Sequence, residues 1–431
     1  MSAQTIDATA GRAQPAEEAS LLLRPSFKLP ITFAIGTLLA LIMTVTAGGD
    51  TAVRLARGGE ALTIPDFTVA AMPVCAVFAV LAAGLTAYSF VVARARRPIP
   101  AWLSVGVLAC VVFAFFIWAG AGTGRFVTLT MVLATGLALA TPLVFGSMAG
   151  VVCERVGIVN IAIEGQLLAG AFLAAVVATM TGNPYAGLLA APVAGALVGV
   201  LLALFSVRYH VDQIIVGVVL NVLVAGFTAV MFGAVLSDDP ARFNSRTPLP
   251  VLPIPLLSEI PVIGPVLFRQ TLLVYLMYAL VILLNIYLFK SRWGLRLRSV
   301  GEHPKAADTV GINVNRTRWL NTLIGSAFAG LGGAYFTIGS GLAFGKDMSG
   351  GNGYIALAAM ILGRWKPTGA LVAALLFGFA KSIALLLPSI GASLPSEFMN
   401  MIPYLVTILA VAGFVGKVRA PAAENIPYVK S

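Results

Sequence analysis

Long apolar runs recur along this chain of 431 residues, and they constrain its fold more than any motif does. A helix needs about 20 mostly apolar residues to cross the hydrocarbon core of a bilayer. Apolar residues make up 59% of the chain and charged residues 10%, whereas soluble domains carry about a quarter charged residues. We therefore predict an all-α integral membrane protein, a polytopic bundle of about 10–12 transmembrane helices.

The runs that fit a span extend from the N-terminal region to the C-terminus. They cover residues 29–48, 67–92, 101–120, 126–151, 161–181, 185–207, 214–236, 270–289, 319–340, 354–363, 368–387 and 401–416. The run 354–363 is too short to span alone. It is either extended by residues 348–353 or forms a half-helix.

The basic residues between these runs predict the topology. The basic clusters all fall on one side of the membrane if the short run 354–363 also crosses it. They lie at 94–97, 208–210, 291–318, 364–366 and 417–419. Under the positive-inside rule that side is the cytoplasm. We therefore expect a multi-pass protein with both termini cytoplasmic, and we interpret the net charge of +11 as a response to anionic lipid rather than to nucleic acid.

The same pattern divides the chain into parts. We expect residues 1–28 to be a disordered cytoplasmic tail, 29–100 an additional N-terminal transmembrane pair, 101–416 the core, and 417–431 a cytoplasmic C-terminal tail. Residues 237–269 are proline-rich and predict a structured outer loop. Glycine-rich breaks at 157–165 and 350–363 each precede a helix, one in each half of the core. Interrupted helices at matching positions are typical of transporters built from internal repeats.

A short helix is predicted inside the basic segment 291–318. Pro304 suits a first helical turn, and Gly311 suits a helix end. Ala306, Ala307 and Val310 then form a small apolar face. From charge alone, an ordinary solvated loop is the alternative.

Polar residues within the apolar runs are candidates for a path or gate, because charges in lipid are costly. Asn160 and Glu164 are four residues apart, hence on one face of a helix, and Gln166 follows. A carboxylate near a helix start gains from the helix dipole. Glu164 could order an inner gate or touch the solute. Asn221 lies in mid-span, where a lone amide commonly bonds a neighbouring helix.

The sequence shows no catalytic machinery. Residues 340–347 resemble a phosphate loop but lack its first glycine and its final Ser or Thr. The two histidines and three cysteines form no metal-binding pattern, and we expect neither a disulfide nor a cofactor on this chain. Glu154 and Arg155, at the inner edge of the fourth run, are interpreted as a salt-bridged pair that anchors a helix.

Three motifs resemble one family of transport proteins. They are TPLVFGSMAGVVCERVGIVNIAIEG at 141–165, GLRLRSVGEHPKAADTVGI at 294–312 and GYIALAAMILGRWKP at 353–367. Together they are similar to the membrane permeases of ABC importers for simple sugars, branched-chain amino acids and purine nucleosides. Glu164 followed by Gly165, where amino-acid permeases more often show His-Gly, makes the chain most similar to the nucleoside and simple-sugar branch. Lys305 stands where the family's loop signature has Glu.

The resemblance implies a type II-like importer permease over residues 126–416, in a bacterial plasma membrane, that carries a nucleoside or simple sugar. Its implied partners are cytoplasmic ATPase subunits that hydrolyse the ATP, a second permease subunit (a paralogue or another copy) and an extracytoplasmic solute-binding protein. The implied ATPase-coupling residues are Gly301, Glu302, Pro304, Ala306, Ala307 and Gly311. The implied translocation path or gate contains Asn160, Glu164, Gln166, Asn221 and Tyr354.

Two other classes of protein remain as alternatives. One is a proton-coupled secondary transporter with Glu164 as the proton carrier. The other is an integral-membrane enzyme, which would need clustered polar residues near a membrane surface, and the sequence has none.

Overall fold

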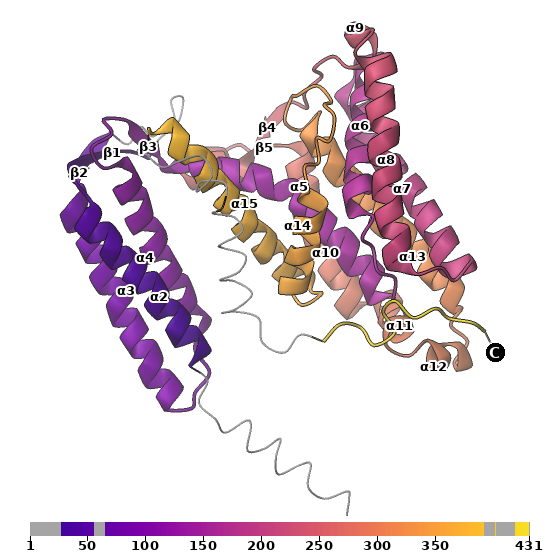
Figure 1. Cartoon of the computed structure of the whole chain (residues 1–431), viewed down its shortest axis with the longest axis horizontal. Coiled ribbons are helices and arrows are strands. Elements are labelled where there is room, and N and C mark those ends of the chain that lie inside the picture. The colour runs from indigo at the N-terminus through magenta and orange to yellow at the C-terminus, as the bar shows by residue number, and fades with distance from the viewer. Residues whose placement is uncertain (1–26, 56–64, 392–400, 402–418, 431) are drawn as a thin grey trace, which may run out of the picture.

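The computed structural model describes residues 27–55, 65–391, 401 and 419–430. Within them nine helices are long and apolar enough to cross a membrane, which confirms the predicted fold class (Figure 1). These helices are α2 (Lys28–Thr46), α3 (Ala71–Arg94), α4 (Ala101–Gly120), α5 (Leu129–Arg155), α6 (Ile163–Thr181), α7 (Pro184–Ala203), α8 (Gln213–Met231), α10 (Leu272–Lys290) and α15 (Pro367–Ser389). π-helical turns extend α7 as η1 (Leu204–Arg208) and α8 as η2 (Phe232–Leu236).

Two further helices complete the described part of the bundle. The more polar α13 (Val314–Gly333) packs against α5, α6 and α7, so its polar side chains Asn321, Thr322 and Ser326 are buried inside the bundle. It ends earlier than the predicted run 319–340, because the chain turns through η5 (Ala334–Phe336). The short run is α14 (Asn352–Leu362). The twelfth predicted run lies, except for Met401, outside the described residues.

The first three helices form a group of their own, at the left of Figure 1. α4 packs against α2 and α3, although we had expected it to join the core. A small sheet in the order β2-β1-β3 covers one end of the group, with β1 (Asp50–Arg54) antiparallel to β2 (Phe67–Ala70) and parallel to β3 (Phe126–Thr128). The helices of the apolar runs 67–92 and 126–151 therefore start later than predicted, as α3 and α5. The first residues of these runs include β-branched and aromatic residues and pair as the strands β2 and β3.

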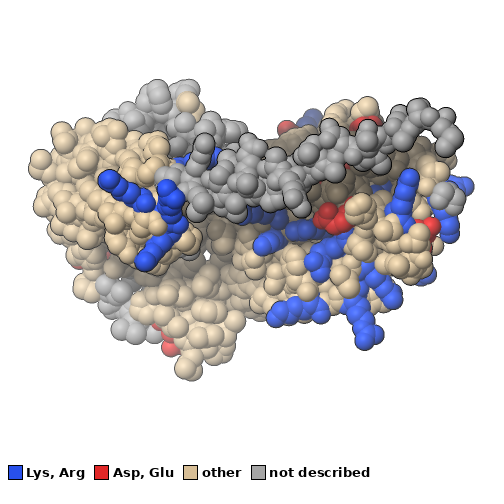
Figure 2. Space-filling model, turned by 90° about the horizontal axis from the view of Figure 1, so that it is seen from below, with Lys and Arg blue, Asp and Glu red and all other residues tan. Residues whose placement is uncertain are grey.

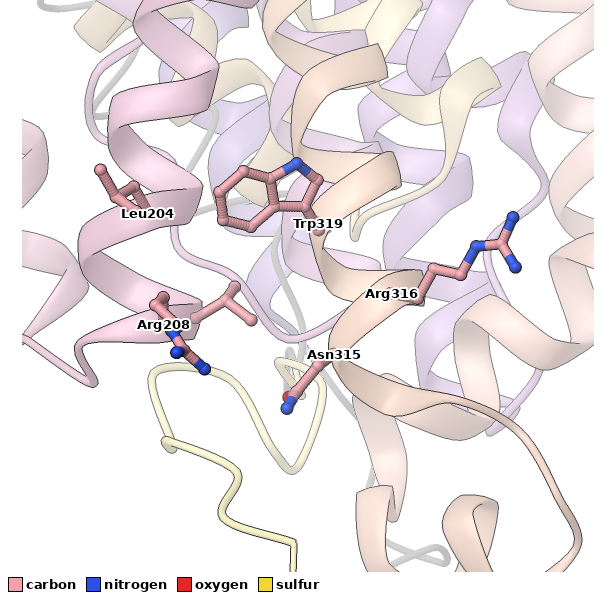
Figure 3. Close-up of a pocket in the computed structure, with 6 residues that line it drawn as sticks. Leu204, Arg208, Asn315, Arg316 and Trp319 are labelled. Atoms are coloured by element: carbon pink, nitrogen blue, oxygen red, sulfur yellow. The ribbon is translucent and has the colours of Figure 1, made fainter.

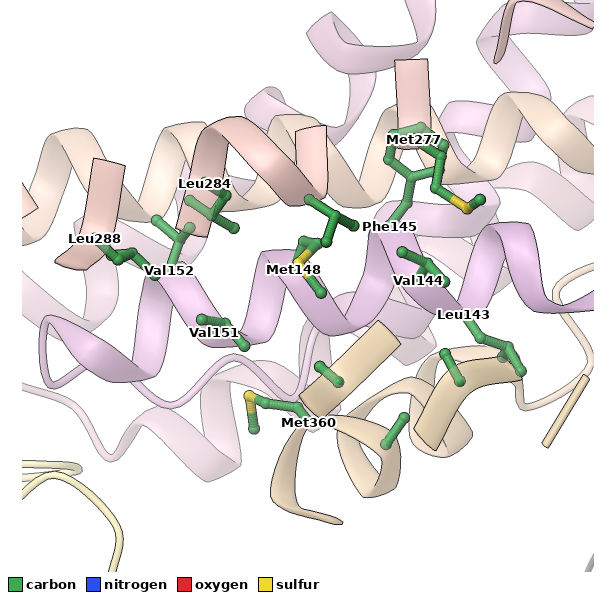
Figure 4. Close-up of a cluster of buried hydrophobic side chains, with 14 of the residues drawn as sticks. Leu143, Val144, Phe145, Met148, Val151, Val152, Met277, Leu284, Leu288 and Met360 are labelled. Carbon is green, nitrogen blue, oxygen red and sulfur yellow. The ribbon is translucent and has the colours of Figure 1, made fainter. Parts of the chain in front are cut away.

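α5 is the central helix of the remaining bundle. Its apolar side chains pack against α10 on one side, where Val152 lies beside Leu284, and against α14 on the other, where Val151 lies on the side of Met360 (Figure 4). Small residues allow the closest approaches. A Cβ on Gly170 would lie 2.0 Å from the carbonyl oxygen of Gly330, so α6 and α13 touch backbone to backbone. Close packing of this kind is how membrane helices associate without a hydrophobic driving force.

The two ends of the bundle carry different structures. One end holds α11 (Arg292–Glu302) and α12 (Pro304–Thr309), at the bottom of Figure 1. The other end holds the segment 237–269, which contains α9 (Pro240–Phe243), η3 (Leu257–Glu259), η4 (Gly264–Phe268) and a hairpin of β4 (Val251–Pro253) with β5 (Arg269–Thr271). We call the first of these ends the α11–α12 end.

Candidate functional site

The two glycine-rich breaks of the sequence meet inside the bundle. Glu164, in the first turn of α6, accepts hydrogen bonds from the backbone N–H of Gly351 (2.7 Å, to Oε1) and of Gly353 (2.5 Å, to Oε2). The carboxylate thus satisfies N–H groups that have no partner inside α14, at the positive end of its dipole. α14 has 11 residues and so is roughly 16 Å long, about half the hydrocarbon thickness. It is a half-helix, and its N-terminus lies inside the bundle.

This junction leaves no room for a side chain at Gly353. A Cβ there would lie 2.4 Å from the backbone nitrogen of Glu164 and 2.7 Å from its Oε2. Gly351 has φ +78°, a left-handed conformation that favours glycine. The glycines of the second break are therefore needed for the carboxylate to reach the helix start.

Asn160 and Gln166 form a buried pair beside this junction. Each amide donates to the other, at 3.0 and 3.1 Å, and Gln166 also donates to Ser326 Oγ of α13 at 3.0 Å. Both side chains are 0% exposed. Asn160 precedes the first residue of α6, so the predicted shared helical face with Glu164 does not form. Through Gln166 the pair joins α6 to α13.

Asn221 connects α8 to both breaks. Its Oδ1 accepts the N–H of Gly165 at 2.8 Å, and its Nδ2 donates to the carbonyl oxygen of Ile161 at 2.9 Å and to the hydroxyl of Tyr354 at 3.2 Å. Tyr354 itself is 49% exposed. Of the predicted path residues, Glu164, Asn221 and Tyr354 therefore meet at the start of α14.

Lys381 belongs to the same cluster, and our sequence analysis missed it. Its Nζ donates to Asn352 Oδ1 at 2.6 Å, between the two glycines that bind Glu164. The side chain is half-buried in α15, a membrane helix. A single lysine in the apolar run 368–387 was the available signal, because a cation within a span is costly and usually functional.

At the α11–α12 end, the predicted coupling residues divide into buried and exposed ones. Gly301 is buried against the end of α5, since a Cβ on it would lie 2.1 Å from the carbonyl oxygen of Arg155. Pro304 starts α12, and Gly311 ends it with φ +83°. Ala306 is exposed, but Ala307 is only 3% exposed and packs inward.

The apolar part of the outer surface is therefore made by Ala306 with Val310, the C-cap residue of α12, which is 74% exposed, and Lys305 and Thr309 are exposed beside them. Glu302, also exposed, accepts the backbone N–H of Ala422 at 3.3 Å.

Glu154 and Arg155 are joined to the turn after α14, and no ion pair links them to each other within the described residues. The Trp365 indole donates to Glu154 Oε2 at 2.5 Å, and Arg155 Nε donates to the carbonyl oxygen of Trp365 at 3.0 Å. The pair fixes the end of α5 to the α14–α15 turn. It does so through tryptophan rather than through the salt bridge we had predicted.

A cavity of about 430 Å³ opens away from the Glu164 cluster, between η1 and the start of α13 (Figure 3). Leu204, Arg208, Asn315 and Trp319 are among its lining residues. None of the predicted path residues lines it.

A half-helix whose start is held by a carboxylate inside a multi-pass bundle is typical of membrane transport proteins. The comparisons with known proteins agree. The chain belongs to the family described as "Branched-chain amino acid transport system / permease component", which matches residues 132–411. This confirms the predicted class, an ABC-type permease that is a transport subunit rather than an enzyme.

Two curated relatives match over almost their full length. The guanosine ABC transporter permease protein NupQ of Bacillus subtilis is 39% identical over 316 residues, 70% of this chain and 97% of the relative. The nucleoside ABC transporter permease protein NupC of Lactococcus lactis is 40% identical over 314 residues, 70% of this chain and 98% of the relative. A putative glucose permease, TsgC13 of Haloferax volcanii, is 30% identical over 295 residues, 63% of this chain and 88% of the relative. No solved structure matches the chain.

Proposed function

We propose that this permease carries a nucleoside into the cell and that the Glu164–α14 junction is part of its gate. The observation that carries this proposal is the bidentate hold of Glu164 on the backbone of Gly351 and Gly353. The start of the half-helix can shift away from α6 when those two bonds break. Discontinuous helices of this kind line the solute sites of many transporters.

Nucleosides are favoured as the solute by the relatives. The two that match over 97% and 98% of their length are named for guanosine and for nucleosides, at 39% and 40% identity. The glucose permease is more distant at 30%, and a simple sugar is the second candidate. A nucleoside contains a ribose, and the hydroxyl of Tyr354, whose side chain is 49% exposed, can bond either solute.

The energy would come from partner subunits. We assign ATP hydrolysis to ABC ATPase subunits that dock on the α11–α12 end, with a second permease subunit beside this chain and a solute-binding protein at the segment 237–269. The outward Ala306 and Val310 support docking at α12, because small and medium apolar side chains on an aqueous end fit a protein groove.

This assignment requires the α11–α12 end to face the cytoplasm. Figure 2 views the molecule from this end, where Lys and Arg side chains clearly outnumber Asp and Glu. The basic turn between α3 and α4 lies at the same end in Figure 1. Both features agree with the positive-inside rule and with cytoplasmic termini.

Uptake by the reconstituted complex tests the proposal. We expect vesicles containing the permease, its ATPase and its binding protein to accumulate radiolabelled guanosine in an ATP-dependent manner, with weaker or no accumulation of glucose. Accumulation driven by an imposed pH gradient in the absence of ATP would instead establish the proton-coupled alternative. Accumulation of glucose but not guanosine would reassign the solute.

A further inference from the structure

Residues 419–430 lie outside the three sequence motifs and beyond the family match, which ends at residue 411. Neither the motifs nor the family match therefore gives this segment a role. In Figure 1 it runs along the α11–α12 end beside α11. The backbone N–H of Ala423 donates to the carbonyl oxygen of Gly301 at 2.8 Å, and that of Ala422 donates to Glu302 Oε2 at 3.3 Å. The segment is therefore attached to the last residues of α11, inside the predicted coupling loop.

Arg318 anchors the segment to α13. This arginine is only 2% exposed, and its guanidinium donates to the carbonyl oxygens of Ile426 (2.8 Å) and Ala423 (3.3 Å). A buried guanidinium is costly unless its N–H groups find acceptors, and here the segment supplies acceptors for the two terminal nitrogens, Nη1 and Nη2. Gly157 provides the space, since a Cβ on it would lie 2.9 Å from Arg318 Nη2.

The segment also reaches α12. Lys430 Nζ lies 4.0 Å from Asp308 Oδ1. Tyr428 lies in sequence between Lys430 and Ile426, which Arg318 binds, and its side chain is buried at 7% exposure. The neighbouring Val429 points outward at 67% exposure, as Ile426 does at 53%. Apolar side chains of the segment thus lie exposed next to α12, whose own Val310 is exposed.

We propose that residues 419–430 are a second element of the ATPase-docking surface, with Val429 and Ile426 extending the patch that α12 presents. The inference rests on the proposed function, which assigns α12 to docking. An apolar patch on the aqueous end of a membrane protein is suited to a protein partner rather than to lipid. The Lys and Arg side chains that gather at this end of the molecule (Figure 2) would complement an acidic rim on that partner.

The segment would then do more than add contact area. Through Gly301 it contacts the helix that packs on the end of α5, and through Arg318 it contacts α13. A movement of the docked ATPase would therefore reach two central helices directly, in addition to the route through α12.

Co-purification of the partner ATPase with tagged full-length permease tests the inference. Val429→Asp places a charge in the patch without touching the backbone contacts of Arg318, and we expect it to lower the retained ATPase about tenfold. The permease should keep its membrane level and melting temperature. Leu256→Asp is the matched control, because Leu256 is 83% exposed in the segment at the opposite end of the bundle. It should retain the ATPase fully.

Ala306→Trp on α12 separates this inference from the proposed function. If Ala306→Trp releases the ATPase and Val429→Asp does not, α12 docks the partner and the C-terminal segment plays no part. If neither variant releases it, docking at this end is itself wrong. Should Val429→Asp fail to accumulate, Val429→Ser and Ile426→Ser remove the apolar contacts with less disturbance, and unchanged ATPase retention by both overturns the inference.

Discussion

The amide nitrogen of Gly353 lies 2.5 Å from Glu164 Oε2, and a methyl group on Gly353 would lie 2.4 Å from the backbone nitrogen of Glu164. α6 and α14 thus meet at a point with no free volume. Gly353→Ala should separate them, at an overpacking cost of about 1–3 kcal/mol. We expect a lower melting temperature of the purified permease and loss of most guanosine uptake.

Gly226→Ala is the control for this substitution. Gly226 also lies in a membrane helix, α8, but a Cβ there would meet nothing within 4 Å. Its melting temperature and uptake should match those of the unmodified protein. Equal behaviour of the two alanine variants would show that the Glu164–Gly353 approach is not needed.

Removing the charge of Glu164 should weaken the proposed gate without abolishing transport. A glutamine has one acceptor oxygen, so Glu164→Gln keeps one of the bonds to Gly351 and Gly353 and turns a donor toward the other. We expect partial loss of uptake, with the remaining activity dependent on ATP and insensitive to a protonophore at constant ATP. Complete loss of accumulation with surviving exchange would instead indicate that Glu164 carries a proton.

Lys381 offers a test in which stability and function change in opposite directions. A charge in a membrane span costs about 2.5–3.5 kcal/mol on insertion scales, so Lys381→Met should leave the melting temperature unchanged or higher. It also removes the bond to Asn352 at the start of α14, and we expect uptake to fall about tenfold. Lys290→Met, at the exposed end of α10, should change neither quantity. Normal uptake by Lys381→Met would exclude Lys381 from the gate.

The sequence predicts the helices well because the length of an apolar run is a local property. Runs such as 368–387 and 214–236 correspond to α15 and to α8 with η2. The two glycine-rich breaks were also visible in the sequence. The contact between the two breaks, in which Glu164 binds Gly351 and Gly353, was not visible in the sequence. It spans almost 190 residues and depends on how the helices pack.

Two details are misassigned, each for its own physical reason. Asn160 was placed on a helical face with Glu164 by spacing alone, but the chain is not yet helical there and Asn160 pairs with Gln166 instead. Ala307 was placed on the outer face of α12, yet it packs inward, because the direction of a two-turn helix is set by its contacts with neighbouring helices. Periodicity gives relative positions on a helix and cannot give its orientation.

Burial of Glu424 predicts a pH dependence of stability. Burial raises the pKa of this carboxyl, which lies against Glu154. An acid with a raised pKa in the folded state stabilises folding while it is protonated, and this contribution is lost as pH rises above its ordinary value of about 4.3. Glutamine does not titrate, so Glu424→Gln does not lose this stabilisation as pH rises. Its melting temperature should therefore exceed that of the unmodified protein increasingly as pH rises from about 5 to about 7.

Labelling of single cysteines tests the orientation on which the docking assignments depend. Ser245 is exposed in the segment 237–269, and its side-chain hydroxyl bonds only Thr247 within the described residues, at 3.5 Å, so Ser245→Cys should fold normally. Lys305→Cys places a thiol on the exposed surface of α12 at the opposite end. Each is made in a protein whose three native cysteines, all buried, are replaced by alanine. In intact cells a membrane-impermeant maleimide should label Ser245→Cys and reach Lys305→Cys only after permeabilisation. The reverse pattern would put the α11–α12 end outside, where no ATP is available to a docked ATPase.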